Sequence, residues 1–116
     1  MGTILRQSDI ILSFLYDFDL LRENCVFKAK VDFILNGRRK IGEGQVKVSF
    51  DEEDSHAVIR ISNTGWNETF LPVKLESSRH TFSYIPGITL QVTGEDVNPI
   101  IGKFKVSIFP KADVLL

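Results

Sequence analysis

The side chains best suited to metal binding or acid–base chemistry are few and widely spaced. The chain contains two histidines, His56 and His80, and one cysteine, Cys25. A structural zinc centre takes about four ligands, which usually come in closely spaced pairs. These three residues form no such pair, and a single cysteine excludes an intramolecular disulfide. The sequence therefore predicts no metal centre, no bound cofactor and no catalytic histidine.

The densest group of carboxylates is the run Asp51-Glu52-Glu53-Asp54. Calcium binds roughly six to eight oxygen atoms that approach from several directions. Consecutive carboxylates in one tight turn cannot all point toward a single ion. We therefore interpret the run as a solvated turn that keeps a hairpin end soluble, and we do not expect calcium binding.

Sequence motifs of catalysis do not occur in the chain. It has no G-x-S-x-G nucleophile motif, no phosphate-binding glycine loop and no HExxH motif. Gly42 and Gly44 lie in a hairpin arm, so they do not open a helix as a nucleotide-binding motif would. We predict that the protein is not an enzyme. A hydrolase built on carboxylates at loop ends is the weaker alternative.

Positive charge is concentrated in Arg38-Arg39-Lys40, where a hairpin tip is expected. Such a tip can grip phosphates or an acidic protein surface. The whole chain has 14 basic and 15 acidic residues, a formal net charge of −1. Nucleic-acid-binding domains usually carry a basic excess, and no aromatic residue is interleaved with these three charges. Arg38, Arg39 and Lys40 are therefore candidates for binding a protein partner rather than nucleic acid.

A second candidate contact is Trp66, which lies in a stretch, residues 63–67, with the composition of a loop. A tryptophan in a loop either caps the end of a core or anchors a partner. The cap is the more frequent case. If Trp66 is exposed, we expect it to be the centre of a partner-binding site, with Arg60 and Phe70 as neighbours.

Alternation of apolar and polar residues predicts the strands that would position these side chains. Residues 26–35 alternate and are followed by Asn36-Gly37, the pair preferred in a two-residue type I′ turn. A return strand with its own apolar face follows. The expected register places Leu35 opposite Arg38, Ala29 opposite Gly44 and Phe27 opposite Val46. In this register the apolar faces of the two arms coincide, as pairing requires.

Further stretches alternate in the same way and are separated by turn residues. They are residues 57–62, 71–76, 81–84, 88–93 and 103–108. The opening residues 8–23 fit a strand, which their aromatic content favours, or a helix with Ser8 as its N-cap. We predict an all-β fold, an antiparallel β-sandwich or small barrel of about seven to eight strands, with an N-terminal helix if residues 8–23 are helical. Residues 1–116 are expected to form a single domain.

The N-terminal sequence lacks the pattern of a secretory signal, and no apolar run is as long as a membrane span. Together with the unpaired cysteine, this pattern favours a cytoplasmic location and predicts no membrane span.

These observations favour a non-enzymatic interaction module, an adaptor or assembly domain. We expect it to bind a protein partner, or a second copy of itself, through a sheet edge or end loops. The apolar residues Val114-Leu115-Leu116 favour a homo-oligomer. The alternative is a small β-barrel that binds an apolar small molecule, which would require an enclosed apolar cavity.

Overall fold

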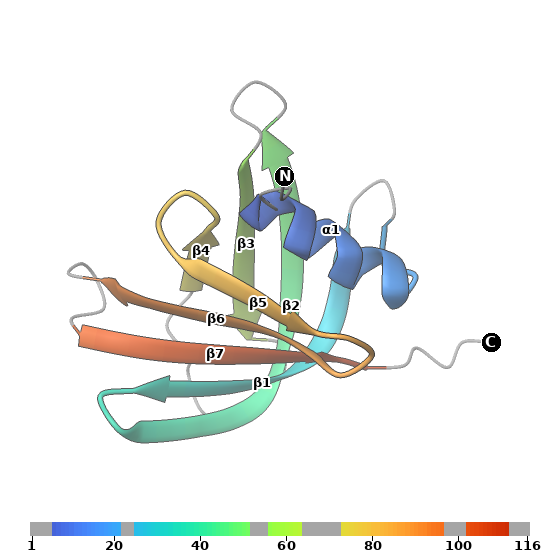
Figure 1. Ribbon diagram of the computed structural model, residues 1–116. Helices are drawn as coiled ribbons and strands as arrows, with labels where there is room; N and C mark the ends of the chain where they lie inside the picture. Colours follow the sequence, from blue (N-terminus) through green and yellow to red (C-terminus); the bar gives the residue numbers. More distant parts are fainter. Residues whose placement is uncertain (1–5, 22–24, 52–55, 64–72, 97–101, 112–116) are drawn as a thin grey trace.

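The computed structural model describes residues 6–21, 25–51, 56–63, 73–96 and 102–111. Within these ranges the chain forms one helix and seven strands (Figure 1). In chain order they are α1 (Gln7–Asp17), β1 (Val26–Leu35), β2 (Arg38–Asp51), β3 (His56–Asn63), β4 (Val73–Glu76), β5 (Thr81–Ile85), β6 (Thr89–Asp96) and β7 (Gly102–Pro110).

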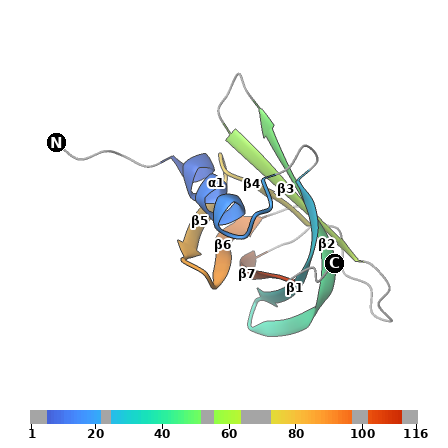
Figure 2. The ribbon, with the colours of Figure 1, turned by 90° about the vertical axis from the view of Figure 1, so that its right-hand side faces the viewer.

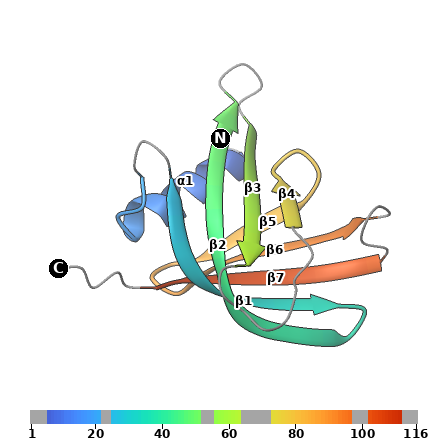
Figure 3. The ribbon, with the colours of Figure 1, turned by 180° about the vertical axis from the view of Figure 1, so that it is seen from behind.

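The seven strands form one antiparallel sheet in the order β4-β3-β2-β1-β7-β6-β5. The sheet curls into a half-barrel, and α1 lies on its concave side (Figure 2). Seen from behind, β1, β2 and β3 lie in front of the helix (Figure 3). The prediction of an antiparallel all-β fold with one N-terminal helix is confirmed.

The hairpin of β1 and β2 has the register that the sequence predicts, including Leu35 opposite Arg38, Ala29 opposite Gly44 and Phe27 opposite Val46. Asn36 and Gly37 connect the arms with φ angles of 49° and 80°. A type I′ turn needs positive φ at both positions, and its twist matches that of the flanking strands. The turn type and the alternation therefore fix one register together.

The preference for a strand at the N-terminus is wrong, because residues 7–17 form α1. Ile11, Phe14 and Leu15 are completely buried, which is the spacing of one helix face. Ser8 is not the N-cap. The helix begins after Arg6, whose backbone N–H donates to the Asp9 carboxylate at 3.3 Å, and Ser8 is buried in the first turn.

The apolar faces of the strands and α1 form a single core on the concave side. Phe14 is at its centre, with ring centroids 5.4 Å from Phe18, 6.1 Å from Phe27 and 5.7 Å from Tyr84. The helix thus occupies the space that a ligand-binding barrel would keep open. The convex face carries the charged residues of the same strands, as period-two alternation requires.

A buried histidine closes the turn between β4 and β5. His80 Nδ1 accepts a hydrogen bond of 3.0 Å from the backbone N–H of Glu76. The His80 backbone N–H donates to the Glu76 carbonyl at 2.9 Å. Its ring packs edge-on against Phe104, with centroids 5.2 Å apart. His80 is therefore buried and contacts both the β4–β5 turn and β7.

Candidate functional site

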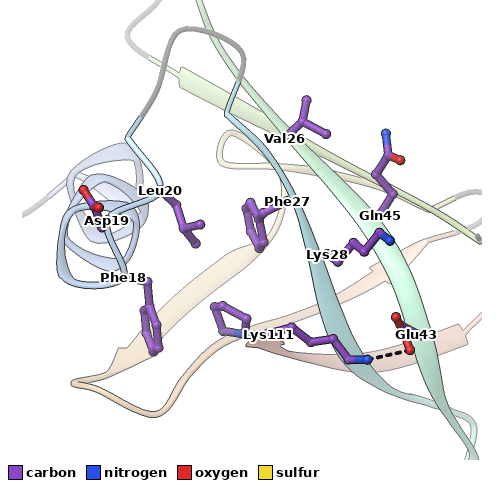
Figure 4. A pocket seen from close by; sticks show the side chains of 10 residues that line it. Phe18, Asp19, Leu20, Val26, Phe27, Lys28, Glu43, Gln45 and Lys111 are labelled. Atoms are coloured by element: carbon purple, nitrogen blue, oxygen red, sulfur yellow. Dashed lines mark ion pairs between the residues drawn. The ribbon is translucent and has the colours of Figure 1, made fainter. Parts of the chain in front are cut away.

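A pocket of about 780 Å³ lies where the end of α1 meets the start of β1 (Figure 4). Its apolar wall consists of Phe18 and Leu20 from the helix end and Val26 and Phe27 from β1. Charged and polar side chains of β1, β2 and the end of β7 form the remaining rim. The pocket therefore offers an apolar wall and a polar rim at the same opening.

The way in which α1 ends creates the apolar wall. Asp19 has a φ of 55°, a left-handed conformation that asparagine and aspartate adopt more readily than most residues. This reversal lets the Leu20 backbone N–H donate to the Leu15 carbonyl at 2.8 Å. Leu20 is consequently folded back onto the helix and is buried, while the Phe18 ring contacts Phe14 in a tilted arrangement. Both side chains are thereby held in place beside the pocket.

Beside this wall β1 extends past the last residue of β7 that the structure describes. The pairing of β1 with β7 ends at Ala29 opposite Pro110, and the Lys111 N–H still donates to the Lys28 carbonyl at 3.0 Å. On the other side, the Cys25 carbonyl accepts from Val48 of β2. Backbone groups alternate between the two neighbours of a strand. Those of Val26 therefore point to the β7 side, where no strand in the described ranges continues.

An ion pair marks the limit of the pocket toward β2. The Lys111 ammonium lies 2.6 Å from the Glu43 carboxylate, as Figure 4 shows. The hydrogen bond from Lys111 lowers the pKa of Glu43 below its usual range. Glu43 therefore stays ionised at neutral pH and does not act as a general acid there. The Lys111–Glu43 ion pair therefore places two opposite charges at the pocket rim, and Glu43 does not donate a proton there.

Exposed apolar side chains belong to the segments around the pocket. Leu21 is 51% exposed and Val26 is 37% exposed. The turn between β5 and β6 adds Ile85 and Ile88, which are also exposed. The Tyr84 hydroxyl joins that turn to the helix by donating to Asp17 at 2.7 Å. The helix end, the start of β1, the β5–β6 turn and the end of β7 lie at one end of the molecule (Figure 1), where exposed apolar groups favour an interaction site.

The predicted basic tip lies at the far end of the β1–β2 hairpin. Arg38, Arg39 and Lys40 are all exposed, as expected for a projecting turn. Arg39, however, binds Asp32 in a fork: its Nε donates at 3.0 Å and its Nη2 at 2.7 Å. A guanidinium held in this way has fewer donors left for an external anion.

The Arg39–Asp32 ion pair makes the stability of the fold depend on pH in the acid range. The hydrogen bonds from Arg39 hold the pKa of Asp32 below its usual range. The pair therefore stabilises the fold above the unfolded-state pKa of about 3.9 and loses its effect as pH falls through the lower folded-state value. We expect Arg39→Gln to weaken the fall of the urea midpoint between about pH 4 and pH 2. Arg38→Gln is the control, and an equal change in both variants would contradict this assignment.

The other residues predicted to bind a partner are Arg60, Trp66 and Phe70, and of these the structure describes Arg60. Arg60 lies on the convex face of β3 and is exposed. Trp66 and Phe70 lie outside the described residues, so their expected contact with Arg60 stays a prediction. Sequence reasoning missed the pocket, although it gave a helix within residues 8–23 as one alternative. The turn Asp19-Leu20 after that helix was the available signal.

Comparisons with known proteins add no further constraint. No protein-family model, no curated protein and no solved structure matches this chain. Among the described residues, no group of three or more His, Cys, Asp or Glu side chains could hold a metal ion. The described helix is too short and too polar to cross a membrane.

Proposed function

We propose that this chain is a non-enzymatic protein-interaction module whose partner adds an extended segment to the open edge of β1. The observation that carries the proposal is that, within the described residues, β1 extends beyond the end of β7 next to an apolar pocket. An unpaired strand edge supplies backbone donors and acceptors for a partner, and adjacent pockets select its side chains. Here the partner's backbone would pair with Val26, and one of its apolar side chains would contact Phe18 and Leu20.

The two outer strands of the sheet are less suited to this role. β4 has only four residues, a length that limits strand addition. β5 is partly covered by α1, because the Phe82 N–H already donates to the Gln7 side chain at 2.6 Å. The predicted use of a sheet edge therefore applies best to the start of β1.

A small amphipathic molecule is the second candidate occupant. The pocket volume of about 780 Å³ falls within the range of about 300–1,000 Å³ typical of small-molecule sites. The rim carries Lys28, Glu43 and Lys111, so a purely apolar ligand would leave these groups poorly solvated. Native mass spectrometry of protein purified without denaturation tests this candidate, because a bound molecule adds a small mass increment that acid removes.

The experiment for the interaction module compares proteins captured by the immobilised wild type and by Val26→Asn. Val26→Asn replaces an exposed apolar contact at the open edge without changing the charge. Ile41→Asn is the matched control, because Ile41 is 50% exposed on the far part of β2. We expect a captured protein, once purified, to bind Val26→Asn at least about tenfold more weakly than wild type, since central apolar contacts dominate such interfaces.

Hydrogen exchange on the purified complex then identifies the binding mode. Strand addition should slow exchange of the Val26 amide, which in the free protein points to the open side of β1. A partner that binds both asparagine variants equally, or leaves the Val26 amide unprotected, would contradict the proposed edge. A small molecule in the pocket would instead appear as the mass increment.

A further inference from the structure

Three cations form a row across the convex face of the sheet. The strand register places Lys47 of β2 directly opposite Arg60 of β3, and Arg60 directly opposite Lys74 of β4. All three side chains are exposed. Neighbouring strands are about 4.8 Å apart, so the row places its charges on adjacent strands within one short span.

The row of three cations is expected to destabilise the sheet rather than stabilise it. Like charges directly opposite each other on neighbouring strands are destabilising. Glu76 lies on the same face, where its carboxylate is 3.7 Å from Lys74 and 3.4 Å from Arg79. One carboxylate is thus shared by two cations. In the part of the chain that the structure describes, no ion pair involves Lys47 or Arg60.

The surroundings of the row indicate which anion it fits. Along β2 and β3 the next residues on this face are Gln45 and Ser49 beside Lys47, and Val58 and Ser62 beside Arg60. On β4 the described neighbour of Lys74 is Glu76. None of these side chains has an aromatic ring on which a base could stack. The formal net charge of −1 for the whole chain also lacks the basic excess of nucleic-acid-binding domains. Carboxylates on alternate residues of an extended chain are about 6.6–6.8 Å apart, which is shorter than the roughly 9.6 Å that two interstrand steps span, so two of them can contact the row at once.

We propose that Lys47, Arg60 and Lys74 form a binding surface for an acidic segment of a partner protein. Arg60 is at the centre and donates to carboxylates from a planar guanidinium, while the two lysines supply flanking charge. The surface lies on the convex side of β2, β3 and β4, and Lys47 at its end is directly opposite Val26 of β1. It gives the protein a second contact whose chemistry is electrostatic.

The direct test measures binding of a polyglutamate peptide to the purified protein at low salt. We expect Arg60→Glu to reduce the affinity at least tenfold and added NaCl to weaken wild-type binding, because both remove attraction between opposite charges. Lys105→Glu is the matched control, since it makes the same charge change on β7 at an exposed position. Equal losses in the two variants, or no binding of polyglutamate to wild type, would overturn the proposal.

Two further probes separate the competing anionic partners. An oligothymidylate of equal charge and phosphatidylserine vesicles are titrated under the same conditions. Tighter binding of either probe than of polyglutamate would assign the row to nucleic acid or to a lipid surface and overturn the acidic-protein assignment. Val26 is opposite Lys47, but Val26→Asn changes no charge, so this variant should bind polyglutamate as wild type does. Loss of polyglutamate binding in Arg60→Glu and loss of partner binding in Val26→Asn therefore test the two proposals separately.

A thermal measurement tests the row without any partner. Arg60→Thr removes the central charge and places a residue with good strand propensity at an exposed position. We expect its Tm to rise by about 2 °C relative to wild type at low salt, with a smaller difference at high salt. A lower Tm would show that Arg60 stabilises the fold and would overturn the premise that the row is retained for binding.

Discussion

Phe14→Ala is expected to lower the free energy of unfolding by about 3–5 kcal/mol. Phe14 has no exposed surface, and its ring contacts Phe18, Phe27 and Tyr84. It thereby joins the helix to the central strand β1 and to the outer strand β5. Removing the ring deletes aromatic contacts and leaves a cavity that these neighbours, held by separate strands, can fill only in part. Urea unfolding followed by circular dichroism measures the loss.

Tyr16→Ala is the control for this prediction. Tyr16 is on the same helix but is 76% exposed, so its replacement should change stability by no more than about 0.5 kcal/mol. A similar loss in the two variants would mean that the Phe14 effect does not come from its buried contacts, because alanine itself favours the helix. A loss below about 1 kcal/mol for Phe14→Ala would contradict the position of α1 inside the sheet.

The difference between the two ends of the β1 strand shows what sequence patterns can predict. At its far end, Asn36-Gly37 and the alternation of both arms are local signals that agree with each other, and they specify the register completely. At its near end, the open edge depends on where β7 stops relative to β1. That offset, with Ala29 opposite Pro110, depends on residues far apart in the chain. The sequence pattern of neither strand alone indicates it.

The helix was misassigned for a related reason. Phe14 and Phe18 fit both an alternating pattern and a helical stripe, because a separation of four residues is compatible with either period. Aromatic content favoured the strand. The outcome depends on tertiary structure, because a sheet that curls leaves a concave face that a single amphipathic helix can fill. Arg39 shows the same limit, since its pairing with Asp32 depends on cross-strand geometry.

The second large effect is expected at Gly94 of β6, which lies against the buried histidine. A Cβ atom at this position would come within 2.6 Å of His80 Cδ2 and 3.0 Å of Phe104 Cζ. Neither ring is free to move, because His80 is hydrogen-bonded to Glu76 and packed on Phe104. We therefore expect Gly94→Ala to destabilise the fold by about 1–3 kcal/mol, the cost typical of overpacking. Thr93→Ala, at the exposed neighbouring position, should cost about 0.5 kcal/mol or less.

A double-mutant cycle shows whether the imidazole causes this cost. His80→Ala alone should lose about 2–4 kcal/mol, because it leaves a cavity and an unpaired Glu76 N–H. In that variant the space beside Gly94 is vacant and the Phe104 ring can shift into it. Adding Gly94→Ala should then cost less than about 0.5 kcal/mol, a strong departure from additivity. Additive losses would show that the contact with Phe104, 3.0 Å from the added Cβ, causes the cost instead of the imidazole. Coupled losses would show that β6 lacks a side chain at this position so that His80 can hold the β4–β5 turn against the sheet.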